Sequence, residues 1–326
     1  MKRLVSGMQP SGQLHIGNYL GAIKNWLELE KQYECIFGMY DLHAMTEGLA
    51  PEVLKKNVLE TAMDYLASGI DPKKSTLMVQ SWVPEHTYLA WIFNTLTPVS
   101  WLERVPTYKD KSQQFAKNIN MGLLDYPVLM AVDILLYKAV VVPVGEDQAA
   151  HIELTREIAR TFNGKYGETF PEPKMISGPG ARIMSLVDPT VKMSKSKGSN
   201  HYIALNDSPE IIKKKLASAV TDTGNDGKEP KRPGVANLFQ LLNLFSKVET
   251  REKFETTYHK KNIRYAEVKA TLAEDIANHF ADFRKRRTDL EKHPDKVLDI
   301  LREGSKHAQR IAQKTIQEVK EKVGLL

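Results

Sequence analysis

The sequence is poor in cysteine and has no long apolar run, and both absences narrow the classes of protein it can encode. Cys35 is the only cysteine among 326 residues, which excludes an internal disulfide and any zinc or iron–sulfur site built from cysteines. No apolar run approaches the roughly 20 residues that a membrane-spanning helix needs. Residues 1–7 carry two basic side chains, but the apolar stretch of a signal peptide does not follow them. We therefore expect a cytoplasmic protein with no membrane association.

Length and composition are those of a folded protein with an uneven charge distribution. Hydrophobic residues make up 42% and charged residues 26% of the chain, which is long enough for one large or two medium domains. The net charge is +6, yet residues 1–200 hold 21 basic and 21 acidic side chains, whereas residues 201–326 hold 25 and 19. This excess favours a polyanionic partner for the C-terminal part, although a solvated helical surface explains the charge about equally well.

The first 200 residues alternate short strand-like segments with longer helix-like ones. Helices are expected at residues 18–32 and 51–66, and strands at residues 4–6, 36–40, 75–80 and 140–144. Strands separated by helices predict a parallel α/β sheet. Such a sheet binds ligands in the loops at the carboxyl ends of its strands.

Beyond about residue 200 the strand signal ends. Residues 207–210 form a strong helix start, residues 221–233 read as a loop, and helices are expected over residues 235–247, 265–287 and 297–323. The sequence therefore predicts an α/β domain over residues 1–202 and an all-helical domain over residues 203–326. The last helix is a candidate to pack back onto the first domain.

A glycine-rich turn follows the first expected strand. Residues 6–12 read SGMQPSG, and His15, Gly17 and Asn18 open the next helix. Glycine lets a backbone approach a ligand closely, and a helix N-terminus offers N–H groups to phosphate. The imidazole of His15 can also donate to a phosphate oxygen. Turns of this type are common, so the motif alone is weak.

A second motif is basic. Residues 192–199 read KMSKSKGS and hold three lysines and three serines. Ammonium groups on flexible stems suit a leaving pyrophosphate, and the small residues permit the loop to close over a ligand. The alternative is a solvated linker between domains.

Together, the two motifs resemble the signature motifs of the class I aminoacyl-tRNA synthetase family, with Asn18 in place of the second histidine of the first motif. The strings GNYLGA, YPVLMAVDILLY, PVGEDQ and GARIMSL, which begin at residues 17, 126, 143 and 180, narrow the resemblance to the bacterial tryptophanyl branch of that family. The resemblance implies a Rossmann-like catalytic domain at residues 1–202 and a tRNA anticodon-binding domain at residues 203–326. It also implies activation of L-tryptophan with ATP and transfer to tRNA(Trp).

The same resemblance implies roles for individual residues around ATP. Charge that develops on the phosphates would be stabilised by His15, Lys111, Lys192 and Lys195, with Mg²⁺ bridging phosphate oxygens and no metal ligand in the protein. ATP is expected to contact Gln9, Pro10, Ser11, Gly17, Asn18, Gly145, Glu146, Asp147, Ile183, Lys192, Met193, Ser194, Lys195 and Ser196. Simpler interpretations exist for Asp147, as a helix cap, and for Lys111, as a surface charge.

Residues 126–137 are apolar except for Asp133. On a helix Tyr126, Met130 and Asp133 share one face, and a buried carboxylate is costly unless it finds a donor. The residues alone favour a backbone, arginine or lysine partner, whereas the resemblance implies the indole N–H of tryptophan. The polarisable Met130 could pack against an aromatic ring. For the rest of the amino-acid site the resemblance implies Val5, His43, Tyr126, Val142, Val144 and Gln148, with Tyr126 and Gln148 at the ammonium and carboxylate end.

Members of this family are homodimers whose interface lies between about residues 80 and 135, where this chain has Trp91, Ile92, Phe93 and Trp101. The chain is too short for an inserted editing domain, which suits a bulky indole read by a buried polar group.

Three alternatives remain. A tyrosyl-tRNA synthetase shares both motifs, but the string around Asp133 favours tryptophan. A non-catalytic tRNA or tryptophan sensor would be expected to lose one motif, and a nucleotidyltransferase would lack the second. Two departures from the family are Lys197, where a non-basic residue is expected, and Leu42, where glutamine is expected. They bear on loop closure and on the shape of the amino-acid site.

Overall fold

The computed structural model describes residues 1–106, 119–178, 183–221 and 230–326. The chain forms two compact units: unit 1 holds residues 1–12, 22–180 and 290–326, and unit 2 holds residues 13–21 and 181–289. The sequence predicts a single boundary, after residue 202. In the structure, residues 13–21 belong instead to unit 2 and residues 290–326 belong instead to unit 1. Residues 13–21 join unit 2 because His15 pairs with Ala204 in an antiparallel bridge. Residues 290–326 join unit 1 because their helix packs along a strand of its sheet.

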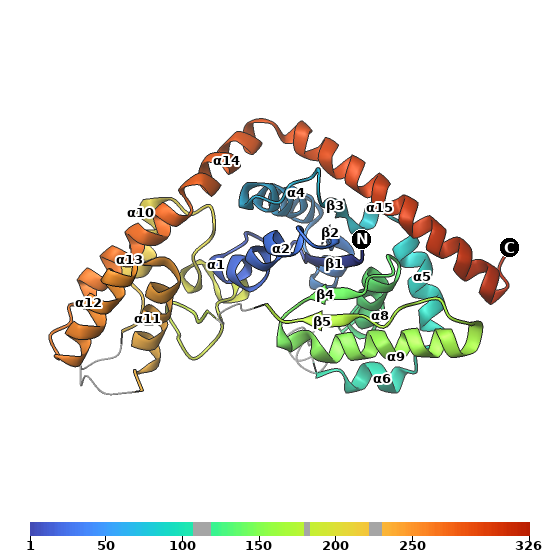
Figure 1. The fold of residues 1–326 in the computed structure, drawn as a ribbon, viewed down its shortest axis with the longest axis horizontal. Coiled ribbons are helices and arrows are strands. Elements are labelled where there is room, and N and C mark those ends of the chain that lie inside the picture. The colour runs from blue at the N-terminus through green and yellow to red at the C-terminus, as the bar shows by residue number, and fades with distance from the viewer. Residues whose placement is uncertain (107–118, 179–182, 222–229) are drawn as a thin grey trace. The chain divides into compact units, whose positions relative to one another are not determined.

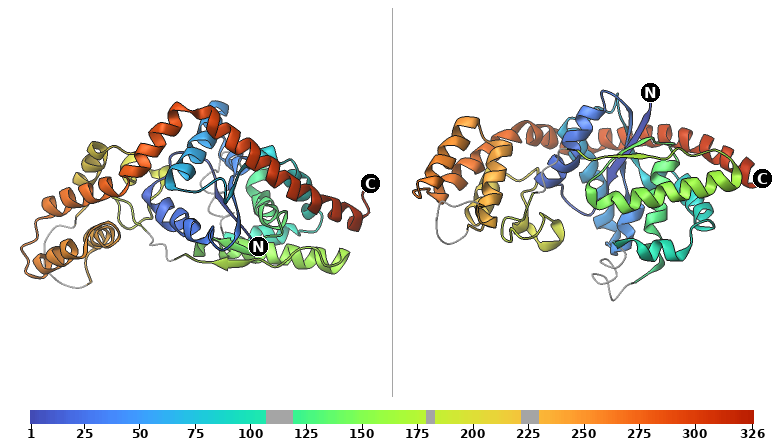
Figure 2. Two further views of the ribbon diagram at one scale, coloured as in Figure 1. Left: turned by 45° about the horizontal axis from the view of Figure 1, so that its top comes forward. Right: turned by 60° about the horizontal axis from the view of Figure 1, so that its bottom comes forward.

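Unit 1 is built on a five-stranded parallel sheet. The strands are β1 (Arg3–Met8), β2 (Glu34–Met39), β3 (Thr76–Val79), β4 (Val141–Pro143) and β5 (Lys174–Ile176). Their order is β3-β2-β1-β4-β5, and every pair is parallel (Figure 1, Figure 2). The predicted α/β fold with a parallel sheet is therefore confirmed. Strand β5 was not predicted, because a segment of three residues is too short to give a pattern.

The chain leaves β1 toward β2 and β3, and returns to the other side of β1 for β4 and β5. The switch point of the sheet therefore lies at the carboxyl ends of β1 and β4, where such sheets bind ligands. Ser6 Oγ donates to the carbonyl oxygen of Pro143 over 3.0 Å and ties these two ends together.

Helices surround the sheet of unit 1. They are α2 (Lys24–Leu29), α3 (Asp41–Ala44), α4 (Pro51–Ser68), α5 (Glu85–Asn94), α6 (Val99–Arg104), α8 (Met121–Leu135), α9 (Ala149–Tyr166) and α15 (Pro294–Val323). Helix α8 packs on β1, α5 and α9, whereas α15 lies along β3, α4 and α5. In the described part of the chain, no helix combines the length and apolarity needed to cross a membrane.

Two adjacent glycines shape the sheet beside the site. Gly7 of β1 pairs with Gly38 of β2, and a Cβ atom on Gly7 would lie 2.2 Å from the carbonyl oxygen of Gly38. A Cβ atom on Gly38 would lie 2.5 Å from the ring of Tyr40. Both glycines therefore make room for the Tyr40 ring, which packs edge-on against His43 with centroids 5.9 Å apart.

Unit 2 is mainly helical, as predicted beyond residue 200. It contains α1 (Ile16–Asn18), α10 (Pro209–Ala217), α11 (Pro233–Phe245), α12 (Val248–His259), α13 (Tyr265–His279) and most of α14 (Ala281–Lys292). Helix α10 packs on α13, and α11 packs on α12 and α13. The residues before α10 form a hairpin in which Met184 pairs with Lys192, so the start of the predicted lysine loop is anchored in unit 2.

Candidate active site

Asp133 is the centre of a buried polar network in unit 1. It lies on α8 and is 2% exposed. Its Oδ2 atom lies 2.7 Å from Nε2 of His43, and its Oδ1 atom accepts a hydrogen bond from Nε2 of Gln80 over 2.6 Å. Nδ1 of His86 lies 2.8 Å from the same Oδ1 atom. Among the described residues, the partners of the carboxylate are thus two histidines and an amide, and not the backbone, arginine or lysine that the residues alone favour.

His43 was predicted from the sequence, whereas Gln80 and His86 were not. Gln80 follows β3 directly, and a polar residue at the carboxyl end of a buried strand is a signal that could have identified it. His86 is buried on α5 and gives no such signal. Its Nε2 atom lies 2.7 Å from the hydroxyl of Tyr137, whereas its Nδ1 atom is close to Oδ1 of Asp133 but is not aligned for a hydrogen bond.

The charge state of Asp133 follows from these contacts. Burial alone would raise the pKa of Asp133, but the adjacent imidazoles of His43 and His86 outweigh it and hold that pKa below its ordinary value. An ionised carboxylate only accepts hydrogen bonds, with about two lone pairs on each oxygen. Gln80 and His86 occupy Oδ1, and His43 occupies one position on Oδ2. Among the described residues, one acceptor position on Oδ2 is therefore left.

Leu42 departs from the family pattern without disturbing this network. Its backbone N–H donates to Oε1 of Gln80 over 3.1 Å, which orients the Gln80 amide so that its nitrogen faces Asp133. Any residue other than proline supplies the same N–H. The side chain at position 42 is therefore not needed to hold Gln80.

The other residues predicted to contact the amino acid are Tyr126, four apolar residues and Gln148. Tyr126 lies near His43, with ring centroids 6.3 Å apart, and its hydroxyl is 2.9 Å from Nε2 of His151, a residue that sequence analysis missed. Four apolar predictions belong to the same hydrophobic cluster as Tyr40: Val5 and Val142, which are buried, and Met130 and Val144, which are partly buried. Gln148 stands apart from this group in its contacts, since its amide nitrogen donates to Oδ2 of Asp147 over 3.1 Å.

The predicted nucleotide contacts in unit 1 lie at the switch point of the sheet. Residues 9–11 follow β1, and residues 145–147 follow β4. Gln9 Nε2 is buried and has no hydrogen-bond partner among the described residues, as expected of a donor that awaits a ligand. A Cβ atom on Gly145 would lie 2.5 Å from Oδ1 of Asp147, so glycine permits this carboxylate to fold back on the loop. Glu146 accepts a hydrogen bond from Ser177.

His15 caps a helix in unit 2 through its side chain. Its Nδ1 atom accepts hydrogen bonds from the backbone N–H groups of Gly17 and Asn18 over 3.1 and 3.3 Å, while Asn18 Oδ1 accepts from the His15 N–H. Asparagine at the second histidine position of the motif thus closes a reciprocal cap. Because Nδ1 is an acceptor, the ring proton of neutral His15 resides on Nε2.

His15 is held neutral. Burial lowers its pKa from 6.5 to about 3, aided by the positive charges of Lys195 and Lys192. A Cβ atom on Gly17 would stand 3.0 Å from the His15 ring and 3.9 Å from Cβ of Met193, which places the two motifs against each other. The two motifs, which are far apart in the sequence, therefore lie together in unit 2.

The lysine loop is anchored by its backbone. Met193 is buried, and its N–H donates to the carbonyl oxygen of Ile183 over 2.9 Å. Lys195 to Lys197 form one 3₁₀ turn, which ends at Gly198 with φ +105°. Lys197 is exposed, and its charge contributes to a lowered pKa of Asp188, for which hydrogen bonds from Thr190 are the larger cause. Pro10, Ser194 and Ser196 occupy the predicted loops, whereas Lys111 lies outside the described residues.

Three features of the structure are typical of one class of nucleotide-dependent enzymes. They are a parallel sheet with a switch point, a turn after β1 that is capped by a histidine, and an anchored lysine loop. The comparisons with known proteins agree with this assignment. The family model for "tRNA synthetases class I (W and Y)" matches residues 1–281. The chain therefore belongs to the class I tRNA synthetase family that comprises the tryptophan and tyrosine enzymes.

The similar proteins identify the branch. The tryptophan–tRNA ligases of Caldanaerobacter subterraneus and Wolinella succinogenes are 45% and 46% identical to the chain, and each match covers 100% of the chain and 99% of the relative. The crystal structure of the Campylobacter jejuni tryptophanyl-tRNA synthetase with ADP and tryptophan has a TM-score of 0.87 and 37% identity, and the match covers 99% of this chain and 100% of that one. The Mycoplasma pneumoniae tryptophanyl-tRNA synthetase gives 0.86 and 33%, with coverage of 100% and 98%.

Proposed function

We propose that this chain is a tryptophan–tRNA ligase, which converts L-tryptophan and ATP to tryptophanyl-adenylate and pyrophosphate and then transfers tryptophan to tRNA(Trp) in protein synthesis. One observation carries the choice of amino acid. Asp133 is a buried, ionised carboxylate with one acceptor position left, and apolar side chains lie around it. The indole of tryptophan offers a single N–H donor on a large apolar body, which suits such surroundings.

In the proposed activation step, a carboxylate oxygen of tryptophan attacks the α-phosphorus of ATP. The bond from this phosphorus to the oxygen that bridges the β-phosphate breaks, and pyrophosphate leaves with the electron pair. No protein base is needed, because the attacking carboxylate is already ionised. Catalysis then consists of positioning and of stabilising charge on the phosphates.

We assign that stabilisation to four residues, as the resemblance implies. Neutral His15 directs Nε2–H toward a phosphate oxygen, since its Nδ1 is engaged with the backbone. Lys192 and Lys195 lie close enough to His15 for their charges to lower its pKa, so positive charge gathers around the same imidazole. Lys111 is assigned the same role. If Mg²⁺ accompanies ATP, it would supply further positive charge at the phosphates.

We assign the nucleoside to the loops after β1 and β4, which include Gln9 to Ser11 and Gly145 to Asp147, together with Ile183. Tyr126 and Gln148 are assigned the ammonium and carboxylate end of tryptophan. In the transfer step, a hydroxyl of the terminal ribose of tRNA attacks the carbonyl carbon of the adenylate, AMP leaves with the electrons of the broken C–O bond, and the departing phosphate accepts the hydroxyl proton. The anticodon is assigned to residues 203–326, which hold the basic excess of the chain.

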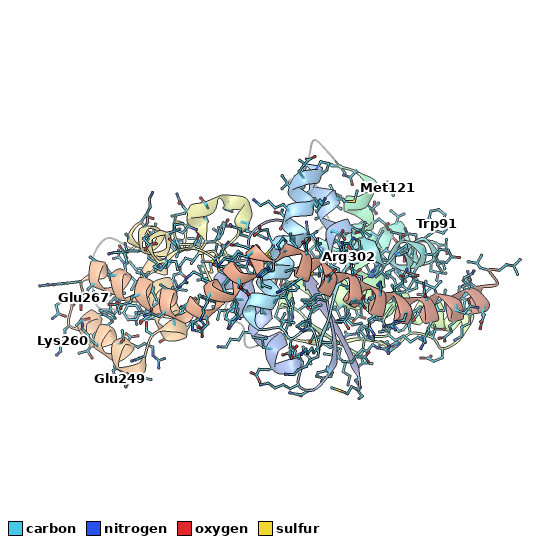
Figure 3. The ribbon with its side chains drawn as sticks, turned by 90° about the horizontal axis from the view of Figure 1, so that it is seen from above. Trp91, Met121, Glu249, Lys260, Glu267 and Arg302 are labelled. Atoms are coloured by element: carbon cyan, nitrogen blue, oxygen red, sulfur yellow. The ribbon has the colours of Figure 1, made fainter. Side chains whose placement is uncertain are left out.

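We also propose a cytoplasmic homodimer. The exposed face of α5 carries Tyr88 and Trp91, of which Trp91 is 72% exposed, and Met121 at the start of α8 is exposed as well (Figure 3). Large exposed apolar side chains grouped on a surface mark an interaction site. Ile92 and Phe93 are buried in the core of unit 1, so they support α5 from beneath and do not form this surface.

The test is ATP–pyrophosphate exchange with tryptophan and tyrosine in parallel. Exchange with tryptophan alone is expected, and replacing Asp133 by asparagine (Asp133→Asn) should raise the KM for tryptophan at least tenfold. Asp125→Asn is the matched control, because Asp125 lies on the same helix and contacts Asn94 instead. Exchange with tyrosine alone would identify a tyrosine enzyme. Exchange with neither amino acid would favour a non-catalytic sensor.

A further inference from the structure

Helix α15 covers β3, the edge strand of the sheet (Figure 1). At Gly304 the helix backbone touches the strand directly. A Cβ atom there would stand 1.9 Å from the carbonyl oxygen of Leu77 and 3.1 Å from its backbone nitrogen. No side chain fits at this position, so any substitution of Gly304 must displace α15 from β3.

The next residue of α15 pairs with the edge strand. Ser305 is 3% exposed, and its hydroxyl oxygen accepts a hydrogen bond from the backbone N–H of Val79 over 3.1 Å. On an edge strand such an N–H otherwise lacks a neighbouring strand to bond. Val79 is the last residue of β3, and Gln80 follows it directly. Ser305 therefore holds the backbone one residue before the amide that binds Asp133.

A second contact from α15 reaches the other partner of Asp133. Nε2 of Gln309 donates to the carboxylate of Glu85, with distances of 3.3 and 3.4 Å to its two oxygens. Glu85 begins α5 and stands directly before His86, which lies 2.8 Å from Asp133. One turn of α15 thus contacts the residues adjacent to both Gln80 and His86.

The exposed side of α15 differs from this contact face. Arg302 and Lys306 are exposed and form ion pairs with Asp299 and Glu303 on the helix itself (Figure 3 labels Arg302). Such exposed pairs contribute little to stability. These positions therefore provide control substitutions next to the contact residues.

We propose that Gly304, Ser305 and Gln309 of α15 are positioning residues for tryptophan recognition. They hold the segment of residues 79–86, which carries Gln80 and His86, and through these two side chains they fix the carboxylate of Asp133. The proposal rests on the proposed function, because it assumes that Asp133 binds the indole N–H. These three residues lie more than 170 positions after Asp133 in the sequence, and we infer that they set how strongly Asp133 binds the indole N–H.

The experiment is ATP–pyrophosphate exchange by the full-length chain with two amino acids: L-tryptophan and 3-(3-benzothienyl)-L-alanine, in which sulfur replaces the indole N–H. For Ser305→Ala we expect the KM for tryptophan to rise about tenfold, the effect of roughly one hydrogen bond, while the KM for ATP stays unchanged. The preference for tryptophan over the sulfur analogue should fall by a similar factor. Lys306→Ala should match the parent protein in the KM for tryptophan, in the KM for ATP and in the preference for tryptophan over the sulfur analogue.

A second variant shows whether Ser305 acts through Gln80. Gln80→Ala alone should also reduce the preference for tryptophan, and adding Ser305→Ala to it should cause little further loss, since the two changes act along one path. Additive losses would overturn the proposal, as would a Ser305→Ala protein with unaltered preference. The proposed function is judged separately: it fails if Asp133→Asn leaves the preference for tryptophan over the analogue unchanged.

Discussion

The pKa of His15 predicts a pH dependence of stability that a single substitution should remove. Burial, with help from Lys195 and Lys192, lowers this pKa from 6.5 to about 3. Between these two values the unfolded chain binds a proton at His15 that the folded chain does not bind. Stability from this residue is therefore present above pH 6.5 and is lost as the pH falls toward 3.

The magnitude follows from the size of the shift. One pKa unit corresponds to about 1.4 kcal/mol, so lowering the pH from 7 to 5 should cost about 2 kcal/mol through His15. His15 is 5% exposed, so solvent screening does not reduce this figure much. Asparagine is a good helix N-cap and does not titrate. His15→Asn should therefore keep the cap. When the pH is lowered from 7 to 5, its free energy of unfolding should fall by about 2 kcal/mol less than that of the parent protein.

The assay is urea unfolding at both pH values, followed by far-ultraviolet circular dichroism. Tryptophan fluorescence is unsuitable, because all four tryptophans lie in unit 1 whereas His15 lies in unit 2. The other titrating groups are common to both proteins and cancel in the comparison. Equal pH dependence would refute the inference that His15 is buried as a neutral ring. The same variant should lose roughly 10²–10³-fold in kcat, because it lacks the Nε2–H donor.

Three further substitutions test other parts of the structure. Gly17→Ala brings a methyl group to 3.0 Å from the His15 ring, so kcat for ATP–pyrophosphate exchange should fall more than tenfold while the KM for tryptophan changes little. Trp91→Glu should convert a dimer to a monomer in analytical ultracentrifugation; a monomeric parent protein would instead disprove the proposed interface. Asp207→Asn leaves the buried ammonium of Lys215 without its 2.6 Å partner and should cost roughly 3–5 kcal/mol of unfolding free energy, which urea titration measures.

Much of the fold was predictable because its signals are local. The strands around Val5, Ile36 and Val142 are apolar runs bounded by turns, and the start of α10 has a serine cap, a proline and an acidic residue in order. The two motifs of the candidate site were recognised for the same reason, since each is a continuous string. What joins them is not local: the bridge between His15 and Ala204 spans most of the first 200 residues.

The partners of Asp133 show where sequence reasoning ends. Asp133 stands out as the one carboxylate in an apolar segment, but Gln80 and His86 lie 53 and 47 positions before it and are brought to it only by packing. The same holds for α15. The spacing of its apolar residues predicts a helix. That spacing does not predict that Gly304 lies against the backbone of Leu77. Periodicity identifies the buried face of an element and not the surface against which it packs.

The network around Asp133 also explains how its carboxylate stays ionised in an apolar site when no substrate is bound. An isolated carboxylate there would take up a proton, and its neutral form would present a donor as well as an acceptor. His43 and His86 keep it ionised, and the hydrogen bond from Gln80 helps to fix the carboxylate before any ligand arrives. The indole N–H then meets an acceptor that needs no reorientation, so binding is not weakened by ordering the site. An amino acid without such a donor would leave that acceptor buried and unpaired, which is the physical basis we infer for selecting tryptophan.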